Sequence, residues 1–276
     1  MKRFSLSLPA IITLAVTFLF SISSWAEQDS ERLELSQTLV NTSGFNGLLQ
    51  QLPLHFERGV KDASSFEKTE NSEQQQLLIK AEQALNAAQI RQQITAAVAR
   101  ALTKKEIATL LQWYNSAAGK RISTAQTQAS SEAGFEAMLF HVNTLLAEED
   151  LLQLATVLDK QLGFVEFIVD LQEFQAFAEY STISILRQQT LDVDAFDEKM
   201  KKEREHMVFN AEQLVMLSLA YAFRDIQKKD ILAYEHFLQQ PLTQLFLKAA
   251  MRGLEVGKQN MVRTWLQQSN RQIASE

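Results

Sequence analysis

The stretch that decides the fold runs from Leu102 to Ile122 and reads L-T-K-K-E-I-A-T-L-L-Q-W-Y-N-S-A-A-G-K-R-I. Thr103 and Glu106 have the spacing of a capping box, in which the threonine hydroxyl accepts a hydrogen bond from the Glu106 N–H and the carboxylate reaches back to the Thr103 N–H. Apolar side chains then follow at the spacing of one helix face; they are Ile107, Leu110, Leu111 and Tyr114. Because cap and stripe agree, the stretch predicts a helix that begins after Thr103.

Three small residues, Ala117, Ala118 and Gly119, interrupt this helix before Lys120 and Arg121. Glycine tolerates the left-handed geometry of a helix C-cap, and it also lets two backbones come close together. We expect a break here by one of these two routes, followed by a second helix.

The remainder of the chain predicts further helices. Its 276 residues include only 8 glycines and 3 prolines, while the good helix formers Gln, Ala, Leu and Glu are abundant. Apolar positions recur with a period near 3.6 residues almost throughout. We therefore expect an all-α helical bundle, with helices at residues 31–42, 45–60, 72–102 (Asn86 being the candidate break), 104–116, 119–130, 132–147, 150–161, 164–190, 194–223, 229–239 and 242–269.

Two segments within this pattern need comment. Pro53 is expected to kink or end the second helix, and the polar residues from Ser64 to Asn71 are expected to form a loop. The phenylalanines between residues 164 and 177 could line an aromatic ligand pocket. At helical spacing, however, such residues more often form a buried core.

A weak internal repeat runs through the helices. At an offset of 124 residues, 86–89 matches 210–213, 104–107 matches 228–231 and Trp113 matches Phe237. Further upstream the offset is 119, where Gly44-Phe45 matches Gly163-Phe164. These matches predict two related multi-helix units, residues 27–147 and 148–276, that arose by duplication.

The N-terminus has the pattern of a secretory signal peptide. Lys2 and Arg3 precede an apolar run over residues 8–22, and Ser24-Trp25-Ala26 provides small residues before a cleavage site. An uncleaved anchor is the alternative, but the apolar run is short for a bilayer span. We expect cleavage after Ala26 and a periplasmic protein, without a lipoprotein anchor or disulfides because there is no cysteine.

The charge of the chain argues against one class of partner. The formal net charge is −6, and removal of the basic signal peptide would make it more negative. Binding to nucleic acid requires the opposite sign, so we expect no nucleic-acid partner.

The residues that usually carry chemistry form no recognisable motif. The chain lacks H-E-x-x-H, a Gly-x-Ser-x-Gly elbow and a glycine-rich phosphate loop. Glu203 and His206 match one E-x-x-H unit of helical di-iron proteins, but that site needs a second unit. We expect no metal and no cofactor, and we assign no catalytic residue. A carboxylate pair brought together by the fold stays open.

The stretch quoted above resembles the exported domain of unknown function 2059 family. The family motif L-[ST]-x-x-E-[ILM]-x-x-L-x-x-[FWY]-[YF]-x-S-x-x-G-[KR] is matched by Leu102, Thr103, Glu106, Ile107, Leu110, Trp113, Tyr114, Ser116, Gly119 and Lys120. The second repeat departs from this motif, with Leu238 at the position of Tyr114. The resemblance implies an exported α-helical protein and supplies no reaction.

The best candidate for a binding surface lies in the same stretch. Adjacent helix positions diverge by about 100°, so Trp113 and Tyr114 cannot both face one core. Either Trp113 packs against a neighbouring helix, or it forms an exposed aromatic and basic patch for a partner. The candidate surface consists of Glu106, Trp113, Tyr114, Lys120 and Arg121.

The last predicted helix is a second candidate, because it is amphipathic and basic. It carries one acid, Glu255, and five cations: Lys248, Arg252, Lys258, Arg263 and Arg271. Its basic side is either solvated or in contact with anionic lipid or an acidic partner. Gly253 and Gly257 fit close packing against another helix.

These observations favour an exported, non-enzymatic binding or interaction protein of the cell envelope. An envelope hydrolase that uses carboxylates gathered by the fold is the alternative. A structural subunit of an assembly is a third possibility, and it would show an exposed apolar patch.

Overall fold

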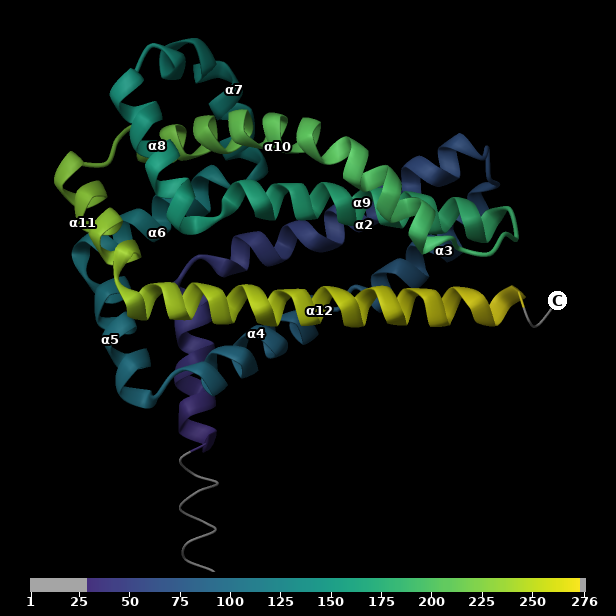
Figure 1. Cartoon of the computed structure of the whole chain (residues 1–276), viewed down its shortest axis with the longest axis horizontal. Helices are drawn as coiled ribbons and strands as arrows, with labels where there is room; N and C mark the ends of the chain where they lie inside the picture. Colours follow the sequence, from purple (N-terminus) through teal and green to yellow (C-terminus); the bar gives the residue numbers. More distant parts are fainter. Residues whose placement is uncertain (1–28, 274–276) are drawn as a thin grey trace, which may run out of the picture.

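The computed structural model describes residues 29–273, so the predicted signal peptide lies outside the described residues (Figure 1). Residues 29–42 are helical, and they are followed by α2 (Phe45–Phe66), α3 (Asn71–Ala84), α4 (Ala87–Ala101), α5 (Lys104–Asn115), α6 (Ala117–Ala129), α7 (Glu132–Leu146), α8 (Glu149–Leu162), α9 (Phe164–Leu186), α10 (Val193–Phe223), α11 (Lys228–Gln239) and α12 (Pro241–Ile273). No strand occurs between residues 29 and 273, which confirms the all-α prediction.

The helix of the quoted stretch begins as predicted. The Thr103 N–H donates to the Glu106 carboxylate at 2.7 Å and the Glu106 N–H donates to the Thr103 hydroxyl at 3.4 Å, which completes the capping box. Ser116 ends α5 and caps α6, where its hydroxyl accepts from the Gly119 N–H at 3.0 Å. A Cβ at Gly119 would lie 2.2 Å from the Trp113 carbonyl oxygen. Close backbone approach, rather than a left-handed cap, therefore explains this glycine.

The candidate break at Asn86 is also confirmed. α3 ends at Ala84 and α4 begins at Ala87. The Asn86 side chain accepts from the Ala88 N–H at 3.0 Å and from the Gln89 N–H at 3.3 Å, so it acts as the N-cap of α4.

Two expectations for the end of α2 are wrong. The helix contains Pro53, which does not end it, and it ends at Phe66 instead of near residue 60. Ser64 and Ser65, expected in a loop, lie inside the helix, where the Ser64 hydroxyl donates to the Val60 carbonyl oxygen at 2.8 Å. A serine that bonds back to the preceding turn is satisfied within a helix, and proline removes only one hydrogen bond of the ladder.

Two long helix pairs hold the molecule together, α2 against α9 and α4 against α12. In Figure 1, α10 runs across the upper part and α12 crosses the view below it, with α2 and α9 between them. Glycines bring both pairs close: a Cβ at Gly59 of α2 would lie 2.3 Å from the Gln175 carbonyl oxygen, and a Cβ at Gly253 of α12 would lie 2.5 Å from Ile94 Cα. The predicted close packing of the Gly253 and Gly257 segment is thus confirmed.

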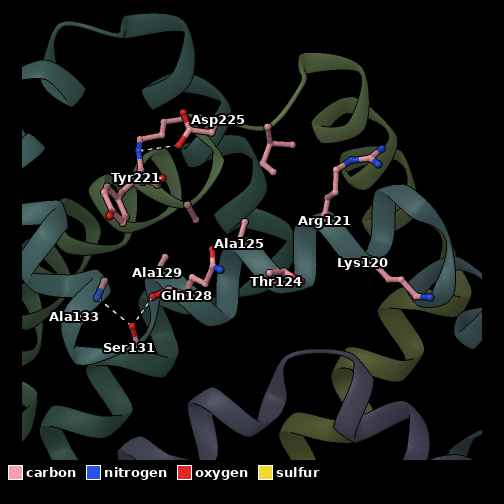
Figure 2. Close-up of a pocket in the computed structure, with 14 residues that line it drawn as sticks. Lys120, Arg121, Thr124, Ala125, Gln128, Ala129, Ser131, Ala133, Tyr221 and Asp225 are labelled. Atoms are coloured by element: carbon pink, nitrogen blue, oxygen red, sulfur yellow. Dashed lines mark hydrogen bonds and ion pairs between the residues drawn. The ribbon is translucent and has the colours of Figure 1, made fainter.

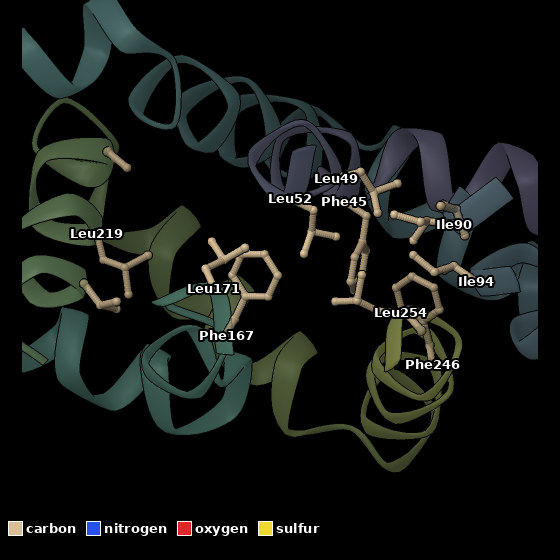
Figure 3. Packing of buried hydrophobic residues seen from close by; sticks show 14 of the residues in the cluster. Phe45, Leu49, Leu52, Ile90, Ile94, Phe167, Leu171, Leu219, Phe246 and Leu254 are labelled. Carbon is tan, nitrogen blue, oxygen red and sulfur yellow. The ribbon is translucent and has the colours of Figure 1, made fainter. Parts of the chain in front are cut away.

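A single hydrophobic cluster connects these helices. It joins side chains of α2, α4, α9, α10 and α12 (Figure 3), among them Phe45, Leu52, Ile90, Ile94, Phe167, Leu171, Leu219, Phe246 and Leu254. Phe167 and Phe174 of α9 are buried, which confirms that the phenylalanines of this helix belong to the core. Trp265 is fully buried beside Phe56, and its indole N–H donates to the Ser181 hydroxyl at 3.0 Å.

Several helix boundaries follow the offsets of the sequence repeat. α5 and α11 both have 12 residues and begin at the matched positions Lys104 and Lys228. α2 and α9 each begin after a glycine in the left-handed region, with φ 85° at Gly44 and 71° at Gly163. Contacts between helices also correspond at this offset. α4 packs on α12, and their counterparts in the repeat, which lie in α10 and α6, pack on each other.

Within residues 29–273, none of the helices has both the length and the apolar character needed to cross a membrane.

Candidate functional site

The two aromatic residues of the candidate surface belong to the contact between α5 and α11. Tyr114 is buried, and burial raises the pKa of its phenol well above the ordinary value. Trp113 is partly buried and stacks on Phe237 with a centroid distance of 4.0 Å and an interplanar angle of 6°. It also stacks on Tyr234 at 5.3 Å. Of the two interpretations of Trp113, packing against a neighbouring helix is the one observed.

Glu106 is engaged in the cap of its own helix. Its carboxylate accepts from both the N–H and the hydroxyl of Thr103 at 2.7 Å. The backbone hydrogen bond, followed by the hydroxyl bond, lowers the pKa of Glu106, because both bonds favour the charged form. This carboxylate therefore stabilises the N-terminus of α5.

Arg121 connects α6 to α11. Its Nε and Nη2 atoms lie 2.9 and 2.8 Å from one carboxylate oxygen of Asp230, a buried acid at the start of α11. Nearby, the Gln126 amide donates to the Tyr234 hydroxyl at 3.2 Å. Removal of Arg121 would leave a buried carboxylate without its partner, which is costly. Arg121 is therefore important for structure as well as being accessible.

Beside these contacts lies a hollow of about 590 Å³, between α6, the start of α7 and the end of α10 (Figure 2). Its volume falls within the range of small-molecule sites, about 300–1,000 Å³. Lys120 and Arg121 lie at one end of the hollow, and Ser131 and Ala133 at the other. The remaining lining residues are Thr124, Ala125, Gln128, Ala129, Gly134, Tyr221, Ala222, Arg224, Asp225 and Ile226. We call this hollow the α6–α10 groove.

The residues that line the α6–α10 groove include more cations than acids. Three of its lining residues are cations, Lys120, Arg121 and Arg224, while Asp225 is the one acid in the described lining. Arg224 lies 3.8 Å above the Tyr221 ring centroid and 3.2 Å from the Asp225 carboxylate. For Lys120, no ion pair is formed within the described part of the chain. The N-terminus of α7, which also favours anions, opens into the same hollow.

Outside this groove, one histidine and two acids make hydrogen bonds or ion pairs between helices. Among the residues that the structure describes, no group of three or more His, Asp or Glu side chains could hold a metal ion. His55 lies 3.0 Å from the Gln175 side chain, and burial lowers its pKa. Arg204 binds two acids of α9, Glu166 and Glu173, at 2.6 Å each.

The groove residues contributed by α10 were not predicted from the sequence. Tyr221 and Arg224 lie at the end of a long helix whose pattern suggests only core packing. The one available signal is that Arg224 follows another arginine, Arg100, by 124 residues, which is the offset of the repeat. They reach the groove because α10 packs against α6, a contact between residues about one hundred positions apart.

Comparison with known families identifies one segment of the chain. Residues 88–137 match the family described as "Uncharacterized protein conserved in bacteria (DUF2059)", which confirms the resemblance carried by the quoted stretch. The matched segment contains nearly all of α4, then α5 and α6, and the beginning of α7. No curated protein and no solved structure matches the chain.

Proposed function

We propose that this protein is exported to the periplasm and acts as a non-enzymatic binding protein that holds an acidic partner of the cell envelope in the α6–α10 groove. The observation that carries the proposal is the concentration of three cations and a helix N-terminus around one hollow in a chain whose net charge is −6. A carboxylate or phosphate group of the partner would gain charge-assisted hydrogen bonds there.

The chemistry of the lining favours binding over catalysis. Arginine stays protonated at all ordinary pH values, so Arg121 and Arg224 suit recognition of an anion better than proton transfer. The runner-up, a hydrolase, requires at least two acids to converge, whereas the described lining of the groove contains Asp225 alone, paired with Arg224 at 3.2 Å.

We also infer that the groove lies between two related units that arose by duplication. In support, helices that contain matched positions pack in matched pairs: α4 lies on α12, and α10, which contains the counterpart of α4, lies on α6. Trp113 and Phe237, matched in the repeat, stack face to face at 4.0 Å. Such a contact between equivalent positions is expected where two like units meet around a local two-fold axis.

The test uses a variant that changes the groove without disturbing the core. Lys120→Glu combined with Thr124→Glu replaces two exposed lining residues of α6, whereas Arg121 is left intact because it pairs with buried Asp230. The purified protein is immobilised and exposed to an envelope extract, and the captured molecules are identified and quantified. We expect an acid-rich partner to be captured by the wild type and at least tenfold less by the variant.

Lys105→Glu combined with Thr109→Glu is the matched control. It introduces the same substitutions at the same spacing on the exposed side of α5, outside the groove, and it should capture the partner as the wild type does. Equal loss in both variants would show a nonspecific charge effect. Equal capture by all three proteins would place the binding surface elsewhere, and a captured partner with no acidic groups would also overturn the proposal.

A further inference from the structure

α7 presents an unusually apolar surface to solvent. Phe135, Leu139 and Leu146 lie on one face of the helix and are 45, 54 and 48 % exposed. Phe140, on the flank of the same helix, is 89 % exposed. Large apolar side chains grouped in this way on a surface are typical of an interaction site. We call this set the α7 face.

The sequence segment that carries the α7 face is acidic. No lysine or arginine occurs between Arg121 and Lys160 in the sequence, whereas this segment contains six acids. Five of the acids are exposed: Glu132, Glu136, Glu148, Glu149 and Asp150. An anionic lipid surface would repel this charge, so the α7 face fits an apolar partner surface with basic side chains.

The outer face of α12 has that character. Its exposed side follows helical spacing and combines two apolar residues, Leu245 and Val256, with the cations Lys248, Arg252 and Arg263. In the described part of the chain these three cations form no ion pair, while the nearby acid Glu255 is engaged by Lys258 at 2.8 Å. We call this set the α12 face.

The two faces have complementary charge, suitable lengths and opposite positions. From Leu245 to Arg263 the α12 face spans about 27 Å, and the α7 face from Phe135 to Leu146 spans about 16 Å, at 1.5 Å per helical residue. α7 lies at the upper edge of the molecule, and α12 lies on the other side of α10 and α9 from it (Figure 1), so one chain cannot join its own two faces.

We infer that the α7 face of one copy binds the α12 face of a second copy, with its leucines and phenylalanines on Leu245 and Val256 and its acids beside the three cations. Because the two surfaces differ, the contact is heterologous and leaves one free face of each kind on every pair. The protein thus associates head to tail, and the association weakens as salt screens the charges.

Two variants, each defective in one face, test this arrangement. Leu139→Glu with Phe140→Glu alters the α7 face, and Arg252→Glu with Arg263→Glu alters the α12 face; all four positions are exposed. Sedimentation of the purified wild type at low salt should give a mass that rises with concentration, beyond that of a dimer. Each variant alone should remain at the monomer mass with unchanged far-UV helicity. An equimolar mixture of the two should form a complex of twice the monomer mass and nothing larger, because one intact face of each kind remains.

Lys201→Glu with Lys202→Glu, two exposed cations of α10, is the matched charge control and should associate as the wild type does. A wild type that stays monomeric at every concentration would overturn the inference. So would association lost in the α7 variant but kept in the α12 variant, since this indicates an α7-to-α7 contact. The groove proposal is independent of this result, because none of the substituted residues lines the α6–α10 groove.

Discussion

At the scale of single residues, Thr103 caps the helix that the family motif forms. Its hydroxyl accepts a hydrogen bond from the Glu106 N–H and donates one to the Glu106 carboxylate. Loss of a threonine N-cap costs about 1 kcal/mol, so we expect Thr103→Ala to lower the free energy of unfolding by that amount in urea denaturation. Thr109→Ala, in the same helix, removes only a bond from its hydroxyl to the Lys105 carbonyl oxygen, and it should change the free energy much less. Equal losses in the two variants would contradict a capping role.

The pH dependence of this cap follows from the lowered pKa of Glu106. A carboxyl group whose pKa is lower in the folded state stabilises the fold above the unfolded pKa, and this contribution is lost as the pH falls through the folded pKa. The difference between wild type and Thr103→Ala should therefore shrink on acidification. NMR titration of the Glu106 carboxyl should give a pKa below that of an ordinary glutamate, and Thr103→Ala should raise it. A difference that stays constant down to low pH would count against this account.

At the scale of helices, the glycines of α12 set how closely α4 and α12 approach. An added Cβ at Gly253 would meet the backbone of α4, 2.5 Å from Ile94 Cα. At Gly257 the clash is milder, because the nearest atom is the Ile90 Cγ2 methyl at 2.9 Å and the nearest backbone atom, Ile90 Cα, lies at 3.3 Å. Overpacking costs about 1–3 kcal/mol, whereas alanine gains about 0.5–1 kcal/mol over glycine in a helix.

We therefore expect Gly253→Ala to be destabilising by about 1–2 kcal/mol once both effects are combined, and Gly257→Ala to be less destabilising. Thermal and urea unfolding of the two variants measure the difference directly. If Gly257→Ala were the more destabilising change, backbone contact at Gly253 would not be the controlling feature.

Local sequence signals predicted most of the helix boundaries, because caps act on their own helix. The Thr103 box and the Asn86 cap are examples. The end of α2 was predicted too early because Pro53 and the Ser64-Ser65 pair are usually found near helix ends, whereas here α2 packs along α9 for its full length. Long-range packing supplied stability that local patterns do not report.

The candidate site was predictable only in part, for the same reason. Lys120 and Arg121 were identified from the sequence and do line the groove. Tyr221 and Arg224 were missed because they lie in another helix and reach the groove through the contact of α10 with α6. Trp113 is adjacent to Tyr114 in the sequence, but its main partner, Phe237, comes from α11.

At the scale of the whole molecule, the two proposed units are interleaved. α4 lies on α12, α2 on α9 and α6 on α10, so each of these pairs joins one unit to the other. The hydrophobic cluster is continuous across both. Two units that share one core should fold and unfold together, unlike independent domains.

A cut between the units tests this interdependence. Ala147 and Glu148 form an exposed turn between α7 and α8, and a protease site inserted there can be cleaved in the folded protein. We expect the two fragments to stay together on size-exclusion chromatography and to unfold in a single calorimetric transition, because separation would expose the packed faces of α2, α4, α9 and α12. The uncut insertion variant controls for the added residues. Fragments that separate under native conditions, or two transitions in the uncut protein, would mean that each unit has a core of its own.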